Sequence, residues 1–271
     1  MTRDGSNSKH IYASGADGTQ AHADRVYIQN SQQLAIESRM LMGAGLIHGW
    51  SGINLFGHNP TLATAFGDLW DAAAVNREDF VSGSGLFISS DNVADTQQMV
   101  IEGINGSSGL QSTIVTMSGQ TKVTVPGTWL EVWHTHNVDT SGFLGDVNIY
   151  TDSAVTTGVP DDTGSVKLYA PADHQLGQVP YFMVPSGKIG MLCCANMWGA
   201  GGKSVEAVFE TRTNDGVWFR MFDVEALNPA TTWTLSAPPR FEAGDRFRIR
   251  AKVDSTTAAV SCGFSIILKD T

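Results

Sequence analysis

The sequence predicts a mainly β protein: an antiparallel, jelly-roll-like sandwich that follows an N-terminal extended or helical arm. From about residue 80 to the end, apolar and polar residues alternate with a period of two in one short segment after another, as they do in half-buried strands. Turn-forming pairs that contain glycine separate many of these segments. Because almost no helical pattern lies between them, an antiparallel sandwich is favoured over a parallel sheet.

The predicted strands are short and closely spaced. They cover residues 85–90, 97–104, 111–118, 120–125, 129–138, 146–151, 164–170, 178–184, 188–197, 203–212, 217–224, 231–236, 245–253 and 258–269. The turn pairs between them are Asn105-Gly106, Ser118-Gly119, Pro126-Gly127, Ser186-Gly187, Asp215-Gly216 and Ala243-Gly244. The pattern is clearest in 245–253, where apolar residues alternate with basic ones, so one face is expected to enter the core.

The chain is expected to have three parts. Residues 1–50 form an arm, and Gly, Ser, Asp, Asn and Thr dominate residues 1–24. This composition cannot support a core of its own, so we expect the arm to be ordered only in an assembly. Within the arm, a strand over 26–29 and a helix from Ser31 to Met42 are expected, with Gly43 and Gly45 ending the helix. Residues 51–79 are predicted to be a short helical connector, and residues 80–271 the β-sandwich domain.

The connector carries the signals of a helix start. Asn59 is a suitable cap and Pro60 is suited to the first helical position, where its missing N–H does no harm. Apolar side chains then follow at helical spacing, namely Leu62, Phe66, Leu69 and Trp70. We expect this helix to plug the open end of a sheet or, alternatively, to be an anchor inserted between subunits.

Composition limits the possible partners. Only 16% of the 271 residues are charged, well below the usual quarter, as expected where much of the surface meets other subunits. The net charge of -10 argues against nucleic acid, and no apolar run approaches a membrane span. The three cysteines, Cys193, Cys194 and Cys262, cannot all pair and lack the spacing of a zinc site. With a polar start that lacks a signal-peptide pattern, they indicate synthesis in a reducing compartment.

Chemistry-bearing patterns are few. His134 and His136 would point to the same side of a strand, but no third ligand follows at a known metal spacing. The acidic loops lack the alternating carboxylates of a calcium loop, and the Gly-Ser runs lack the strand-to-helix context of a nucleophile elbow. We therefore expect no enzyme activity, no metal and no cofactor.

Large apolar side chains are the candidate subunit-interface or anchor residues. They are Trp50, Leu55, Phe56, Leu62, Phe66, Leu69, Trp70, Trp129 and Trp133. Trp129 and Trp133 are expected to share a strand face with Glu131. If that face is outer, it is either a subunit interface, which is typically enriched in Trp, or a platform that stacks against sugar rings. The same choice applies to Trp198, Trp218 and Trp233.

Three stretches resemble a known family. Leu55-Phe56-Gly57-His58-Asn59-Pro60, followed by Thr64-Ala65-Phe66-Gly67-Asp68-Leu69-Trp70-Asp71, looks like the FGxN…TxFxxLWD opening of β-sandwich virion structural proteins in tailed phages of marine bacteria and cyanobacteria. Val100-Ile101-Glu102-Gly103-Ile104 resembles their V-x-I-x-G-L strand, and Val184-Pro185-Ser186-Gly187-Lys188 resembles their V-P-A-G-K turn. The resemblance covers about residues 50–271 and includes no catalytic residues.

The resemblance implies a phage virion structural protein. We expect it to bind neighbouring subunits and to decorate or reinforce the particle, as a capsid decoration or cement protein or as a neck or tail component. Its expected partners are itself, as a homo-oligomer, and other virion proteins such as major capsid, neck or tail subunits. Its expected location is the virion, after synthesis in the host bacterial cytoplasm. The alternative is a host-receptor or carbohydrate-binding protein of a tail or fibre.

Overall fold

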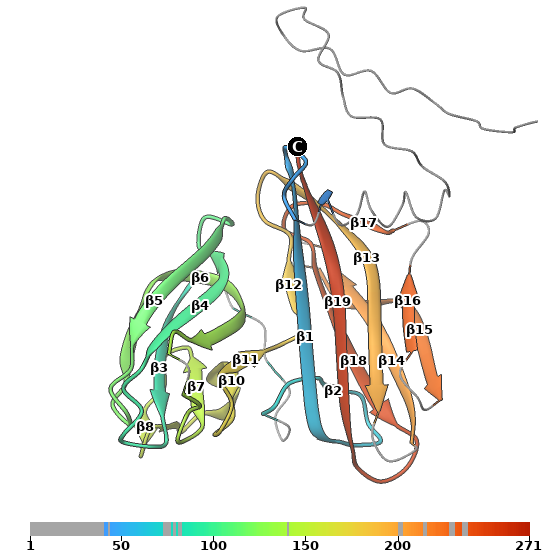
Figure 1. The fold of residues 1–271 in the computed structure, drawn as a ribbon. Helices are drawn as coiled ribbons and strands as arrows, with labels where there is room; N and C mark the ends of the chain where they lie inside the picture. The colour runs from blue at the N-terminus through green and yellow to red at the C-terminus, as the bar shows by residue number, and fades with distance from the viewer. Residues whose placement is uncertain are drawn as a thin grey trace, which may run out of the picture.

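The computed structural model describes residues 41–42, 44–72, 77, 80, 83–139, 141–199, 203–213, 216–227, 231–234 and 238–271. The predicted fold class is confirmed, because the described chain is built mainly of curled antiparallel sheets. Figure 1 shows two lobes side by side, a two-layered sandwich lobe and a smaller inserted lobe. In the described part of the chain, no helix has the length and apolar character needed to cross a membrane.

The sandwich lobe consists of two five-stranded sheets. Sheet A has the order β1 (Trp50–Leu62), β19 (Ala258–Asp270), β13 (Lys188–Gly199) and β16 (Thr231–Thr234), with β17 (Arg240–Phe241) also on β13. Sheet B has the order β12 (Tyr181–Met183), β18 (Arg246–Val253), β14 (Ser204–Arg212) and β15 (Phe219–Leu227), with β2 (Gly67–Asp68) also on β18. The alternation predicted for 245–253 is present, since Phe247, Ile249, Ala251 and Val253 are buried.

The inserted lobe lies between β2 and β12 in the sequence. Its seven-stranded sheet C has the order β10 (Val166–Ala170), β7 (Val147–Tyr150), β3 (Ser84–Ser90), β6 (Val123–Asn137), β4 (Gln98–Asn105) and β5 (Leu110–Thr116), with β11 (Leu176–Gln178) on β6. A small hairpin of β8 (Val155–Thr156) and β9 (Val159–Pro160) and a 3-10 turn (Thr163–Ser165) precede β10. Sheet C curls around a core of its own, separate from the core of the sandwich.

The entry and exit of the inserted lobe are adjacent. Asp68 of β2 pairs with Arg250 of β18, and Tyr181 of β12 pairs with Arg248, two residues along the same strand. The lobe therefore interrupts what is otherwise one edge strand of sheet B.

The helical connector predicted over 51–79 is wrong. Residues 50–62 form strand β1, which pairs with the last strand from Trp50 opposite Lys269 to Leu62 opposite Ala258. Asn59 is no helix cap: its side-chain N–H donates to the Asp68 carbonyl at 2.9 Å, and its Oδ1 accepts from the Thr61 N–H at 3.0 Å. Long-range pairing has overridden a local helix signal, as tertiary contacts often do.

The predicted end of the arm helix is partly visible. Leu41 and Met42 are helical, the Leu46 N–H donates to the Leu41 carbonyl, and the Gly45 N–H donates to the Met42 carbonyl. With Gly45 at φ +69°, this is a Schellman ending, in which glycine adopts the left-handed conformation at low cost. The rest of the arm, residues 1–40, lies outside the described residues.

Two crossings join the lobes. At each one, neighbouring residues point into different cores. At the first crossing, Leu69 enters the sandwich core and Trp70 enters the inserted-lobe core. At the second, Phe182 enters the sandwich core and Tyr181 enters the inserted-lobe core. Because side chains of an extended chain alternate in direction, one strand segment can belong to two cores. The crossings thereby fix the inserted lobe beside the edge strands of the sandwich, β1 of sheet A and β12 of sheet B (Figure 1).

A buried ion pair completes the junction. The guanidinium of Arg77 contacts the carboxylate of Glu131 on β6, with both side chains fully buried. Its Nη2 also donates to the Val132 carbonyl at 2.9 Å and its Nε to the Lys167 carbonyl at 2.7 Å. The backbone N–H of Arg77 donates to Asp68 on β2 at 2.6 Å. Arg77 thus connects sheet B to sheet C.

Gly57 marks a close approach between β1 and the first crossing. A Cβ at this position would overlap the Leu69 carbonyl oxygen and the Pro180 ring, and neither can move without shifting a crossing segment. We predict that Gly57→Ala lowers the free energy of unfolding by about 3 kcal/mol or more. Denaturant unfolding of Gly85→Ala is the control, because a Cβ there meets nothing within 4 Å. Equal stability of the two variants would contradict this account.

Loss of Arg77 should leave a buried carboxylate without its cation. We predict that Arg77→Met lowers the free energy of unfolding by about 3–5 kcal/mol. Arg240→Met, which breaks an ion pair between side chains that are 61% and 63% exposed, should cost no more than about 1 kcal/mol. The double variant Arg77→Met, Glu131→Gln should recover part of the loss in chemical denaturation. No recovery would show that the cost arises from packing rather than from charge.

Asp68 gives the junction a pH dependence. Burial raises the pKa of this carboxyl above its ordinary value, while Arg248, Arg250 and Arg77 oppose the rise. A raised pKa in the fold means that Asp68 favours the folded state when protonated and loses that contribution as pH rises through the folded pKa. The stability of Asp68→Asn relative to the native chain should therefore increase from about pH 3 to about pH 7. Denaturant titrations at several pH values measure this difference, and a decrease would refute the assigned direction.

Candidate functional site

A groove lies where the inserted lobe meets sheet A. Its volume is about 590 Å³, within the range of small-ligand sites. One wall is the edge strand β1, through Ile53, Asn54, Leu55 and Phe56. The facing wall is formed by Glu102, Leu110, Gln111, Ser112, His134 and Gln178, with Trp133 also lining the groove. The two walls come from different lobes, so the junction described above determines the width of the groove.

The inserted-lobe wall is a row of polar side chains across four strands. Ser112 of β5 lies opposite Glu102 of β4, Glu102 opposite His134 of β6, and His134 opposite Gln178 of β11. Residues directly opposite each other in antiparallel strands point to the same face. The row therefore places a hydroxyl, a carboxylate, an imidazole and an amide side by side along the groove.

Glu102 carries a negative charge in this row. Its Oε2 lies 2.8 Å from Nδ1 of His134, and this hydrogen bond lowers the pKa of the Glu102 carboxyl. The side chain is 40% exposed, so its second oxygen can meet a ligand. Within the described residues, the side chains of Ser112 and Gln178 have no hydrogen-bond partner in the protein and are available in the same way.

The β1 wall presents an aromatic ring. Phe56 is 49% exposed, and its ring lies over Gly263 on the outer face of sheet A. A Cβ at Gly263 would come within 2.7 Å of the ring and 2.8 Å of the Asn196 side-chain oxygen. The absence of a side chain at Gly263 lets the ring lie flat on the sheet, with its other face exposed to the groove.

Most of the predicted interface candidates are buried within this chain. Leu55, Leu62 and Leu69 lie in the sandwich core, Trp70 and Trp129 in the inserted-lobe core, and Trp133 packs against Phe182 with ring centroids 5.2 Å apart. Trp50 and Phe66 are half-buried, each beneath lysine or arginine side chains. Among the nine candidates, Phe56 has the most accessible side chain and is the one that lines the groove from outside the core.

The expectation that Trp129 and Trp133 share one face is wrong. Their side chains enter different cores, because the pairing of β6 with β4 shifts register twice, between Glu102 and Gly103 and between Ile104 and Asn105. Each shift adds a residue to β6 and re-aims the side chains that follow. Pro126-Gly127 also proves to be an irregularity within β6 rather than a turn, with Gly127 at φ +92°.

His134 and His136 do share a face, with ring centroids 5.0 Å apart. Within the described residues, no group of three or more His, Cys, Asp and Glu side chains is arranged to hold a metal ion. Among the described residues, the three cysteines form no disulfide, and burial raises the pKa of Cys262.

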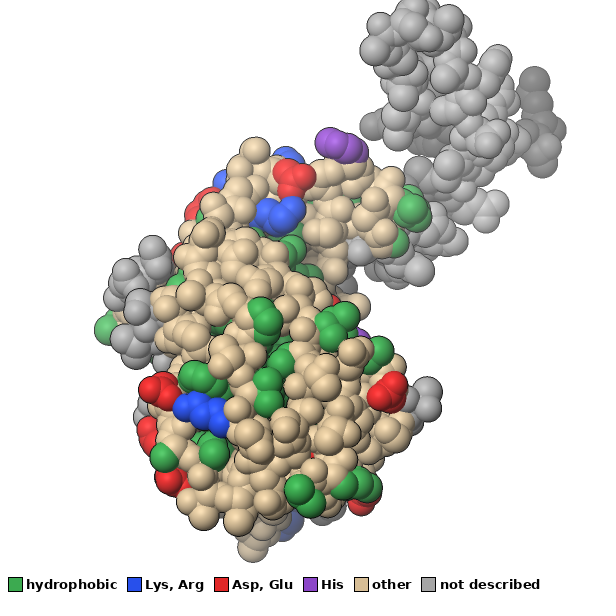
Figure 2. Space-filling model, turned by 90° about the vertical axis from the view of Figure 1, so that its left-hand side faces the viewer, with side chains coloured by type: hydrophobic (Ala, Val, Ile, Leu, Met, Phe, Trp, Pro, Cys, Tyr) green, Lys and Arg blue, Asp and Glu red, His purple; other side chains and the backbone are tan. Residues whose placement is uncertain are grey.

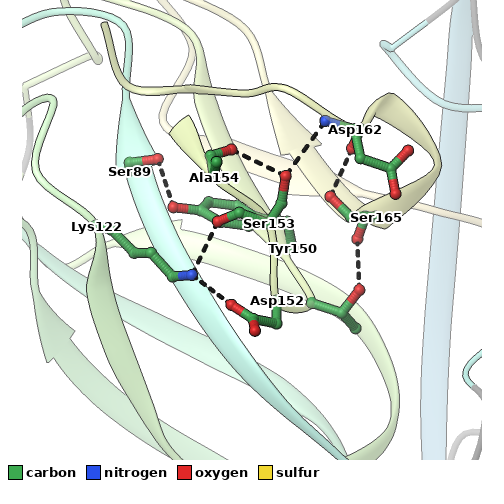
Figure 3. Close-up of polar contacts among 9 residues, drawn as sticks. Ser89, Lys122, Tyr150, Asp152, Ser153, Ala154, Asp162 and Ser165 are labelled. Carbon is green, nitrogen blue, oxygen red and sulfur yellow. Dashed lines mark hydrogen bonds and ion pairs between the residues drawn. The ribbon is translucent and has the colours of Figure 1, made fainter. Parts of the chain in front are cut away.

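A second polar cluster lies in the inserted lobe, away from the groove. Lys122 donates to Asp152 at 2.6 Å and to the Ser153 carbonyl at 2.8 Å, while Ser89 bonds to the Tyr150 hydroxyl at 3.1 Å (Figure 3). Ser89 and Tyr150 are completely buried, and burial raises the pKa of Tyr150. No substrate can reach these hydroxyls, so we interpret the cluster as a clamp on the loop that follows β7.

Sequence reasoning missed the polar row and Arg77. Glu102 lies between apolar residues of β4 at the outward position of an ordinary alternation, so its role depends on the lobe that faces it. Arg77 lies outside any strand pattern, and no sequence signal marks it as buried.

Comparisons with known proteins show only distant similarity. No family model matches the sequence, and no curated protein matches it. Among solved structures, the PBSX exported protein XepA is 9% identical with a TM-score of 0.21, covering 96% of this chain and 99% of that one. A chain in the structure of infectious bursal disease virus Gt strain is 10% identical with a TM-score of 0.20, and the match covers 82% of this chain and 73% of that one. The CBM22-1-CBM22-2 tandem domain of Paenibacillus barcinonensis Xyn10C is 13% identical with a TM-score of 0.17, covering 83% and 94%. Similarity at this level does not assign the chain to a family.

Proposed function

We propose that this chain is a structural protein of a phage virion. In this proposal it binds neighbouring subunits, including copies of itself and other virion proteins, and decorates or reinforces the particle at the capsid, neck or tail. It works in the virion through surface contacts, without catalysis and without a cofactor. The sequence resemblance to phage structural proteins and the charge-poor composition support this proposal.

The observation that carries the proposal is an apolar row on the outer face of sheet C. Ile114, Val100, His136 and Leu176 lie opposite one another on β5, β4, β6 and β11, next to the polar row of the groove. Ile114 is 58% exposed and Leu176 is 42% exposed. Figure 2, which faces the side of the inserted lobe, shows hydrophobic side chains across a surface with few charges. Exposed apolar groups gathered in this way are typical of protein contact sites.

The alternative function, a host-receptor or carbohydrate-binding protein, is favoured by a different observation. The groove combines an exposed aromatic ring with hydroxyl, amide and carboxylate side chains, whereas His136 is the one polar side chain among the four residues of the apolar row. Both functions are compatible in one virion protein, because the groove and the apolar row occupy neighbouring but distinct positions.

Charge placed in the apolar row should prevent subunit contact. We predict that Ile114→Glu and Leu176→Glu each reduce binding of the purified protein to particles that lack it by about tenfold or more. Val93→Glu is the matched control, because Val93 is 73% exposed in a loop outside the row and should bind normally. Occupancy is measured by quantitative mass spectrometry of the purified particles, and sedimentation of the isolated protein measures self-association. Normal occupancy of both row variants would refute the proposal.

A further inference from the structure

The groove and the adjoining face of sheet A have features that indicate a ligand class. Phe56 belongs to both surfaces, as a wall of the groove and as an outward side chain of β1. Across the sheet, Phe56 pairs with Gly263 of β19, which in turn pairs with Asn196 of β13. Two residues further along β13 is Trp198, which is 46% exposed. Strand spacings place the Cα atoms of Phe56 and Trp198 about 12 Å apart on the same face of sheet A.

The groups between and beside these rings are polar, and most of them are amides and hydroxyls. Asn54 and Ser265 hydrogen-bond to each other at 2.6 Å across β1 and β19, and Ser261 pairs with both His58 and Trp198 in the sheet register. His58 is held by Asp71 at 2.7 Å. A face of this kind, with two open rings among amides and hydroxyls, is more polar than the mostly apolar core of a protein interface.

The charge of the groove further limits the class of ligand that it can bind. Among the described residues that line the groove, Glu102 is the single carboxylate, and the chain has a net charge of -10, so an anionic ligand would be repelled. A pyranose ring fits the remaining features, since its C–H face packs on an aromatic ring while its hydroxyls donate to a carboxylate and exchange hydrogen bonds with amides and hydroxyls.

We propose that the groove and the adjoining face of sheet A bind a neutral polysaccharide. Phe56 and Trp198 stack against sugar rings, and Glu102, Ser112 and Gln178 bind the hydroxyls of the segment that enters the groove. Because the site extends from Glu102 on the inserted lobe to Trp198 on β13, it suits a chain of several sugar units rather than a single sugar. This site rests on the carbohydrate-binding alternative proposed above and names its ligand class. It is independent of the structural role, because it uses none of the apolar row.

The geometry favours binding over cleavage. Hydrolysis of a glycosidic bond ordinarily requires two carboxyl groups flanking it, whereas the part of the groove lining that the structure describes supplies Glu102 alone. The sugar chain is therefore expected to leave the site unchanged.

Affinity electrophoresis of the full chain tests the proposal. Native gels contain a mixed-linkage glucan, a galactomannan or a xylan as neutral probes, and alginate as an anionic probe. The protein should be retarded in at least one neutral gel and not in alginate. Phe56→Ala and Trp198→Ala should each weaken binding about tenfold, and Glu102→Gln should weaken it severalfold. Because both rings are half exposed, the melting temperatures should remain unchanged.

Phe219→Ala is the matched control. Phe219 is 50% exposed, like Phe56, but lies on β15 of sheet B, away from the proposed site. Its loss should leave retardation unchanged. The proposal is overturned if no neutral gel retards the protein, if only alginate does, or if Phe219→Ala weakens binding as much as Phe56→Ala. These outcomes say nothing against particle binding, so failure here is distinguishable from failure of the structural role.

Discussion

The arrangement of the two lobes depends on a buried carboxylate that requires a cation beside it. Glu131 is fully buried on β6, and an ionised carboxylate away from water is tolerated only beside a cation. Arg77 supplies that cation and is itself tied to β2 through Asp68, which lies 3.4 Å from Arg250 of β18. The guanidinium carbon of Arg77 also lies over the ring of Tyr181, 4.5 Å from the ring centroid. Any rotation of the inserted lobe would break this series of contacts, so the groove keeps one width.

Much of the fold was predictable because it follows from local sequence patterns. Period-two alternation located most strands of sheets B and C, and glycine pairs located several turns. The first strand was missed because Asn59 and Pro60 imitate a helix start, while the partner of β1 lies some two hundred residues away. A local pattern contains no information about that pairing. The division of the strands between two lobes could not be predicted either, because the strands of both lobes show the same alternation of apolar and polar residues. The lobes are separated at the crossings near Leu69 and Tyr181.

The candidate site was far less predictable than the strands. Large apolar residues were reasonable interface or anchor candidates by type, and most of them are buried in the chain's own cores. Phe56 and Trp198 remain accessible because glycine and small polar residues surround them on an outer face, which depends on register across three strands. The polar row around Glu102 consists of common surface residues. The row becomes one wall of a groove only because β1 faces it across the lobe junction. The register shifts in β6 that direct Trp133 toward this groove cannot be recognised in the sequence.

The pairing of β1 with β19 has a consequence for the order of events during synthesis. β19 lies between β1 and β13 in sheet A, so an inner strand of that sheet is made about two hundred residues after its edge strand β1. Among the described residues, the strands of the inserted lobe pair with one another, so the lobe can fold before β19 has been made. The sandwich must wait for β19, and the apolar side of β1 is exposed until then. A chain on which β19 has not yet been made carries a folded lobe attached to an unclosed sandwich, a species prone to aggregate through its free strand edges.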